Sequence, residues 1–268
     1  MMRKPVVAGS FYEADPALLA RDVSGLMERK KEKIDAAGVI SPHAGYAYSG
    51  CVAGETLSSI EPKNTYIILG PNHTGRGKPF GIDRKRTWKT PLGNIEIDDE
   101  LSGAILKGSS YIEADRACHD DEHSIEVQLP FLQSMKKKFT FVPVVIAAAD
   151  AKTYRGIGSE LAKSVKASKK DVTIIASSDM THYEPRESAE KKDMLAIKKI
   201  LSLDIDGFLE TIEEYGISMC GFAPAAVMMQ ASIELGAKKT KLISYKTSGD
   251  TSGDYSRVVG YAGVVIYR

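Results

Sequence analysis

Short apolar runs bounded by turn residues alternate along this chain with longer segments of helical periodicity. Strands that alternate with helices are typical of βαβ units and therefore of a largely parallel sheet. No low-complexity tract, fixed repeat or Pro/Ser-rich linker divides the chain, so we predict one α/β domain over residues 1–268. The predicted strands are Gly38–Ser41, Thr65–Gly70, Phe139–Ile146, Val172–Ser177, Lys241–Tyr245 and Gly260–Tyr267.

Three of the intervening segments carry clear helix signals. Asp15-Pro16 is a typical helix start, with an N-cap residue followed by proline at the first helical position. Apolar residues recur at helical spacing over 154–165 and again over 125–132, where Pro130 is expected to bend or end the helix. By contrast, Gly81–Ile97 is expected to form two strands joined by a Pro-Leu-Gly turn.

Charge and cysteine content argue against several classes of protein. The 268 residues include 36 basic and 35 acidic side chains, a net charge of +1, so neither nucleic acid nor a membrane surface is expected as a partner. Two charge-free stretches, Ala36–Gly54 and Tyr215–Ile233, are interrupted by proline, glycine and hydroxyl side chains, which is unlike a lipid-facing helix. Three scattered cysteines and the absence of a signal-peptide pattern predict a cytoplasmic protein. No P-loop or dinucleotide fingerprint occurs, so no nucleotide cofactor is expected.

Three of the five histidines follow predicted strands. His43 comes after the first strand, His73 after the second and His182 after the fourth. Groups just beyond the carboxyl ends of parallel strands converge on one crevice, so we expect these three side chains to share a site. One such histidine alone would be interpreted as a hydrogen-bonded loop residue. Three together favour a metal site, because histidine is the commonest metal ligand.

Two further segments have two interpretations each. His119 and His123 are four residues apart, the spacing of one helical face. The segment is either a helix start, where Asp120, Asp121 and Glu122 favour the helix dipole, or it brings His123 or Glu126 to the rim of the pocket. The polar loop Thr247–Tyr255 is either solvated or a lid whose Asp250 or Tyr255 reaches the pocket.

Cys220 precedes a segment that predicts a helix running to about Leu235. A thiolate at a helix N-terminus is stabilised by the unpaired amides there, so Cys220 is a candidate soft metal ligand or nucleophile. The alternative is a buried apolar cysteine. That interpretation is preferred for Cys51 and Cys118.

Five blocks of sequence together resemble one known family. They are SPHAGYAYSG with His43, GPNHTG with His73, HDDEHSIEVQLPFL, SSDMTHYEP with His182, and GISMCGFAP with Cys220. The joint pattern is similar to that of the Memo family, and the segments RKPVVAGSFYEAD and SGDYSRVVGYAG extend the resemblance over essentially the whole chain. The family is similar in fold to the class III extradiol dioxygenases, which are non-haem iron enzymes.

The resemblance implies a single domain similar to the extradiol dioxygenases, with α/β/α layers around a mostly parallel or mixed sheet. It implies His43, His73 and Cys220 as metal ligands, with iron or copper as the metal. His182 matches an acid/base residue, and Asp179 is expected to be its orienter or a neighbouring hydrogen-bond partner. His123, Tyr46 and Asn72 are predicted to contact substrate. Cys220 replaces the carboxylate of the dioxygenases, which softens the site toward Cu(I), zinc or a redox-altered iron.

Three functions follow from these residues. The first is a metal-dependent redox enzyme or oxygenase that takes a small molecule in the metal pocket. The second is a non-catalytic protein that binds a peptide or small molecule in the same pocket. The third is metal-free chemistry with Cys220 as nucleophile and His182 as base.

Overall fold

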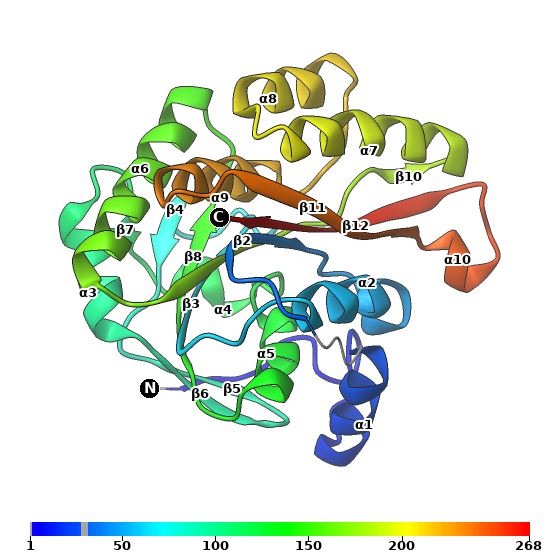
Figure 1. Ribbon diagram of the computed structural model, residues 1–268. Helices are drawn as coiled ribbons and strands as arrows, with labels where there is room; N and C mark the ends of the chain where they lie inside the picture. The colour runs from blue at the N-terminus through cyan, green and yellow to red at the C-terminus, as the bar shows by residue number, and fades with distance from the viewer. Residues whose placement is uncertain (1, 28–31) are drawn as a thin grey trace.

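A twisted sheet forms the centre of the computed structural model, which describes residues 2–27 and 32–268 (Figure 1). All six predicted strands are present, and four of them lie side by side as parallel neighbours in the middle of the sheet. These four are, in order, β8 (Thr140–Ile146), β3 (Thr65–Gly70), β9 (Val172–Ser177) and β2 (Ala36–Ser41). The other two, β12 (Val258–Tyr267) and β11 (Lys239–Thr247), add antiparallel pairs beyond β2, and β10 (His182–Glu184) also pairs with β12. The predicted α/β fold with a mixed sheet is therefore confirmed.

The edge of the sheet beyond β8 is shared by two strands. β6 (Gly93–Ile97) runs parallel to the start of β8, and β4 (Phe80–Ile82) runs antiparallel to its end. β6 also forms the expected hairpin with β5 (Thr87–Thr90). The sequence predicts two strands in this region, but three form. The additional strand is β4, which pairs with the part of the β8 edge that β6 leaves unpaired. β1 (Met2–Arg3) extends the hairpin and β7 (Glu113–Ala114) pairs with β4.

Helices cover both faces of the sheet, because successive residues of the central strands are apolar on both sides. In β3, Tyr66 and Ile68 belong to one buried cluster and Ile67 and Leu69 to another. The first cluster is completed by α1 (Pro16–Leu26), α2 (Tyr46–Ser58) and α5 (Leu129–Met135). The second is completed by α3 (Asp99–Gly108), α6 (Ala151–Ser168), α7 (Arg186–Leu201), α8 (Ile205–Glu214) and α9 (Phe222–Glu234).

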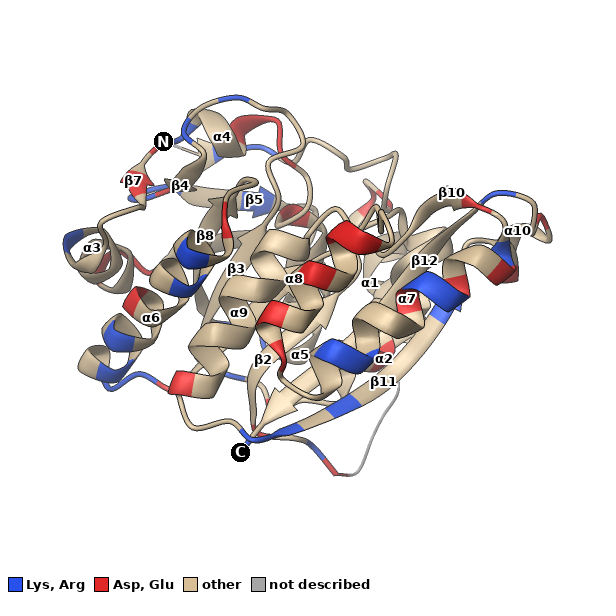
Figure 2. Cartoon of the chain, turned by 90° about the horizontal axis from the view of Figure 1, so that it is seen from above, with Lys and Arg blue, Asp and Glu red and all other residues tan. Residues whose placement is uncertain are grey.

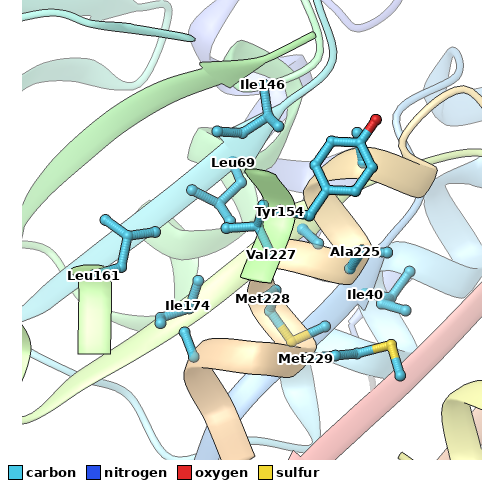
Figure 3. Packing of buried hydrophobic residues seen from close by; sticks show 14 of the residues in the cluster. Ile40, Leu69, Ile146, Tyr154, Leu161, Ile174, Ala225, Val227, Met228 and Met229 are labelled. Carbon is cyan, nitrogen blue, oxygen red and sulfur yellow. The ribbon is translucent and has the colours of Figure 1, made fainter. Parts of the chain in front are cut away.

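Figure 3 shows the second cluster from close by. Val227, Met228 and Met229 of α9 lie beside Ile40 of β2 and Ile174 of β9. All five side chains are fully buried. This packing fixes α9, which begins directly after Cys220 and Gly221, against β2 and β9.

Local sequence signals explain most of the helix boundaries. Asp15 caps α1 as predicted by accepting hydrogen bonds from the amides of Ala17 and Leu18. The periodic segment 154–165 lies within α6, as expected. Pro130 does not end a helix. Instead, a 3-10 turn (Glu126–Gln128) leads into α5, and Pro130 occupies its first turn, where a missing N–H has no cost.

The remaining helices are single turns. α4 (Ala117–Asp120) ends before His123, so the expected helical face shared by His119 and His123 does not form. α10 (Gly249–Ser252) lies in the loop between β11 and β12. Charged residues of both signs are distributed over α6 and α7 (Figure 2). Among the helices that the structure describes, none is both long and apolar enough to cross a membrane.

Candidate metal centre

Histidines from three strand exits meet in one pocket, as the sequence predicts. His43 follows β2, His73 follows β3 and His182 follows β9, and these three strands are adjacent in the sheet. The pocket has a volume of about 240 Å³. Its lining includes these three histidines together with His123, Asp179, Phe11, Tyr183 and Tyr261.

His43 is held from behind by the hydroxyl of Ser177. The Nδ1 atom of His43 lies 3.0 Å from Ser177 Oγ. That hydroxyl donates its proton to the Ser124 carbonyl over 2.7 Å, so it acts as acceptor toward His43 Nδ1–H. The lone pair of His43 is therefore on Nε2, which faces the pocket. Burial, followed by the nearby His73 and His123, lowers the pKa of His43 well below its usual range, so the ring is neutral and able to bind a cation.

His73 is oriented by Glu122. Its Nδ1 lies 2.9 Å from Glu122 Oε1, and its backbone N–H donates to Oε2 over 2.8 Å. Burial alone would raise the pKa of Glu122, but the hydrogen bonds from His73 and from the Ser124 amide lower it to about 2. The carboxylate is thus ionised and accepts from Nδ1–H, which leaves the Nε2 lone pair free. A histidine whose second nitrogen bonds a carboxylate is typical of metal sites in proteins.

His123 completes a cluster of three imidazoles. Its ring stacks on His73 with centroids 4.8 Å apart and meets the ring of His43 edge-on at 5.6 Å. One nitrogen from each of these histidines lies within 4.8 Å of the others, close enough for a single ion to draw them together. From the sequence, His123 is predicted to contact substrate. The structure brings it as near to His43 and His73 as a ligand would be.

Cys220 is not part of the pocket lining, but its Sγ lies 3.1 Å from His43 Nε2. The backbone N–H of Asp179 donates to the same sulfur over 3.3 Å. Burial, and secondarily the charge of Asp179, raises the pKa of the Cys220 thiol. The expected stabilisation of a thiolate by the α9 N-terminus is therefore outweighed, and Cys220 would ionise only when a cation takes the place of its proton.

Asp179 and His182 have separate partners. The Asp179 carboxylate accepts from the amides of His43 and Ala44 at 2.8 and 3.3 Å, and burial raises its pKa to about 6. His182 is oriented instead by Ser218, whose carbonyl lies 2.9 Å from His182 Nδ1. The carbonyl accepts only, so His182 Nδ1 donates to it, and Nε2 has no hydrogen-bond partner within the described part of the chain. The next residue, Tyr183, has a φ of 59°, a strained conformation for a tyrosine.

Other candidate residues lie outside this lining, within the described part of the chain. The Tyr46 hydroxyl donates to the Val127 carbonyl, and its ring packs between Tyr12 and Phe131. Asn72 donates to the Arg76 carbonyl. Both side chains stabilise loops next to the pocket.

The structure also shows where the two segments with alternative interpretations lie, namely 119–126 and 247–255. Glu126 is fully buried in an ion pair with Arg3, 2.6 Å away, and does not reach the pocket rim. Within the Thr247–Tyr255 loop, Asp250 accepts from the Thr247 amide, and Tyr255 lies under the guanidinium of Arg186. The lid interpretation of this loop therefore finds no contact with the histidines among the described residues.

Several residues that shape the site carry no signal in the sequence. Glu122, Ser177 and Ser218 orient the three strand-exit histidines, and Phe11 contacts the His123 ring edge-on at 4.9 Å. Glu122 belongs to an acidic run that is equally typical of a helix start. Only the proximity of His123 within the same block could have pointed to it.

Comparison with known proteins shows the family to which this chain belongs. A family model described as Memo-like protein matches residues 3–265. The chain belongs to the Memo family. A MEMO1 family protein of Methanopyrus kandleri is 42% identical over 282 aligned residues, covering all of both chains. One from Methanosarcina mazei is 43% identical and covers 99% of each.

A solved structure supports the fold alone. An uncharacterized protein of Escherichia coli K12 superposes with a TM-score of 0.59 at 11% identity, covering 85% of this chain and 98% of that one. At this identity the similarity concerns the arrangement of helices and strands and transfers no activity.

Proposed function

We propose that this Memo family protein binds one iron or copper ion at His43 and His73 and uses it in redox chemistry on a small molecule. The observation that carries the proposal is the orientation of the two imidazoles. Ser177 and Glu122 occupy their Nδ1 atoms, which leaves Nε2 of each ring as the candidate ligand atom of two histidines that line one pocket. Imidazole nitrogen suits iron, copper and zinc, so the donor chemistry fits the proposed metals.

The third ligand has two candidates, His123 and Cys220. Three histidines would give an all-nitrogen site suited to iron, copper or zinc. Cys220 in place of His123 would give a softer set that favours Cu(I) or zinc. We favour Cys220 for Cu(I), since displacement of its proton by a cation would remove the cost of a buried thiolate.

The ion, His182 and Asp179 would each have a different role in the reaction. When bound, the ion would supply electron transfer or activation of a small oxidant. His182, whose Nε2 is free, would accept or donate a proton at that atom. Asp179 would hold the His43 loop in place through the two amides that it accepts from.

The test is metal content and affinity, measured separately from activity. The wild type would be purified anaerobically and without chelator, beside His43→Ala, His73→Ala, His123→Ala and Cys220→Ala, with Cys51→Ser as a control outside the pocket. We expect near-stoichiometric metal in the wild type and the control, and loss in His43→Ala and His73→Ala. For each metal, the third ligand is identified by which of His123→Ala and Cys220→Ala loses the metal. Wild-type protein that refuses Fe(II), Cu(I) and Zn(II) would contradict the proposal.

Redox activity has its own readout. Loaded wild type would be screened for oxygen consumption with small phenolic or thiol substrates, beside His182→Ala. We expect His182→Ala to keep its metal and lose turnover. Metal binding without turnover in any screen would leave only the metal-binding half of the proposal.

A second candidate function rests on the rim of the pocket. Tyr183 is 66% exposed and lines the same pocket as Phe11 and Tyr261, an aromatic wall suited to a peptide or an apolar small molecule. Binding without turnover would support this function. Metal-free cysteine chemistry is less favoured, because burial keeps Cys220 protonated.

A further inference from the structure

A second cluster of polar side chains lies between α2 and β11, apart from the histidine pocket. Cys51 of α2 has its sulfur 2.9 Å from the Lys246 amine of β11. Glu55, one turn further along α2, lies 3.0 Å from the same sulfur and 3.5 Å from the same amine. A thiol, an amine and a carboxylate therefore meet at hydrogen-bond distance, contributed by two elements that pack against each other.

The cluster is accessible to small molecules. Cys51, Lys246, Tyr48, Arg186 and Asp250 are among the residues that line a pocket of about 320 Å³. The Lys246 side chain is 41% exposed. By contrast, Cys118 is fully buried and Cys220 is in contact with His43.

We propose that Cys51 and Lys246 form an oxidative modification site, at which a hydroperoxide converts the Cys51–Lys246 contact into a covalent S–N bond. All three cysteines of the chain are free, and the printed contacts of the Cys51 sulfur are with Glu55 and Lys246. Once oxidised, its sulfur has the Lys246 amine as the nearest nucleophile. The bond would join α2 to β11 without a change in the position of either element.

The chemistry balances with the peroxide as the only co-reactant. The sulfur attacks one peroxide oxygen, the O–O bond breaks, and a sulfenic acid and one water form. The Lys246 nitrogen then attacks the sulfur, the S–O bond breaks, and a second water leaves. Sulfur is oxidised by two electrons and the peroxide is reduced to water. Glu55 is placed to take the proton from the thiol and return it to the departing hydroxide in the first step. In the second step it is placed to take a proton from the Lys246 ammonium, so that the nitrogen can attack, and the nitrogen then loses a further proton to the departing hydroxide.

Mass spectrometry tests the proposal directly. The reduced, metal-free full chain would be treated with hydrogen peroxide, alkylated and digested. We expect a linked pair of peptides containing Cys51 and Lys246, about 2 Da lighter than their sum and separated again by dithiothreitol. Cys51→Ser and Lys246→Arg, both checked for an unchanged melting temperature, would lose the linked pair. Glu55→Gln would slow its formation.

Two results would overturn the proposal. One is wild-type Cys51 recovered as sulfinic or sulfonic acid, or as an unreacted thiol, with Lys246 unmodified. The other is a linked pair that survives in Lys246→Arg. The inference is independent of the metal site, since the same crosslink is expected in His43→Ala, so failure of the proposed function would not remove it.

Discussion

Glu122 holds His73 at two points, through the ring Nδ1 at 2.9 Å and the backbone N–H at 2.8 Å. The two contacts fix both the path of the loop after β3 and the rotation of the imidazole. The remaining ring nitrogen of His73 is then available to a cation, and His73 forms a cluster with His43 and His123. Glu122 thus acts on the site through His73.

Glu122→Gln is expected to lower metal affinity by about tenfold to a hundredfold, the usual effect of removing such a carboxylate. The amide oxygen of Gln can still accept the His73 backbone N–H, so the fold should persist. Competition with a chromophoric chelator measures the affinity. Glu61→Gln, an exposed carboxylate, is the matched control and should change nothing. Equal affinities of Glu122→Gln and wild type would show that this contact does not support a metal.

Arg3 is expected to contribute strongly to stability. Its guanidinium donates to the carbonyls of His119 and Glu122 and pairs with Glu126, which is fully buried. Arg3→Met leaves the Glu126 charge buried without its cation, at a cost of about 3–5 kcal/mol in the free energy of unfolding.

Urea denaturation of Arg3→Met beside Lys4→Met, an exposed neighbour, measures this cost. The double variant Arg3→Met/Glu126→Gln should recover part of the loss, because the unpaired charge is then removed. A double variant no more stable than Arg3→Met would mean that the carbonyl contacts of Arg3, rather than the ion pair, carry the effect.

The sequence predicts the strand-exit histidines well because that inference is local. An apolar run followed by a turn and a histidine places His43, His73 and His182 at one edge of the sheet, whatever the helices do. The place of Cys220 just before a helix is also predicted correctly, because the start of α9 is indicated by its own sequence. Contacts between segments far apart in the chain cannot be predicted from such local patterns.

The partners of these histidines come from distant segments. Glu122 reaches His73 from a loop 49 residues away, and Ser218 reaches His182 over 36 residues. Closeness in sequence to a site histidine is also a poor guide, because the neighbouring side chain can point away from the pocket. Tyr46 is close to His43 along the chain, but it starts α2 and turns its ring into the core.

Packing of α1 against α2 gives a matched pair of glycine variants. A Cβ on Gly54 of α2 would overlap the backbone carbonyl oxygen of Leu26, which cannot move aside as a side chain would. We expect Gly54→Ala to destabilise the protein by about 1–3 kcal/mol. A Cβ on Gly25 of α1 would meet no other atom within 4 Å. Gly25→Ala should therefore stabilise the protein by about 0.5–1 kcal/mol. Thermal melts of the two variants should shift in opposite directions, and a shift in the same direction would contradict this packing.

His119 is expected to make stability depend on pH. It is fully buried, with Nε2 3.1 Å from the Gly81 carbonyl and its ring against Trp88. Burial lowers the pKa of His119 from 6.5 to about 4, against the opposing charge of Asp83. Between these values the unfolded chain binds a proton that the folded chain does not, so the free energy of unfolding falls as pH drops from about 6.5 to about 4, by about 3 kcal/mol.

The measurement is urea denaturation of metal-free protein at pH 7 and pH 4.5, for the wild type and for His119→Gln. The Gln amide can still donate to the Gly81 carbonyl but does not titrate. His43 and His123, whose pKa values are also lowered by burial, are present in both proteins, so their effect cancels in the comparison. The variant should lose less stability on acidification than the wild type. An identical loss in both proteins would mean that His119 is not held neutral by its surroundings.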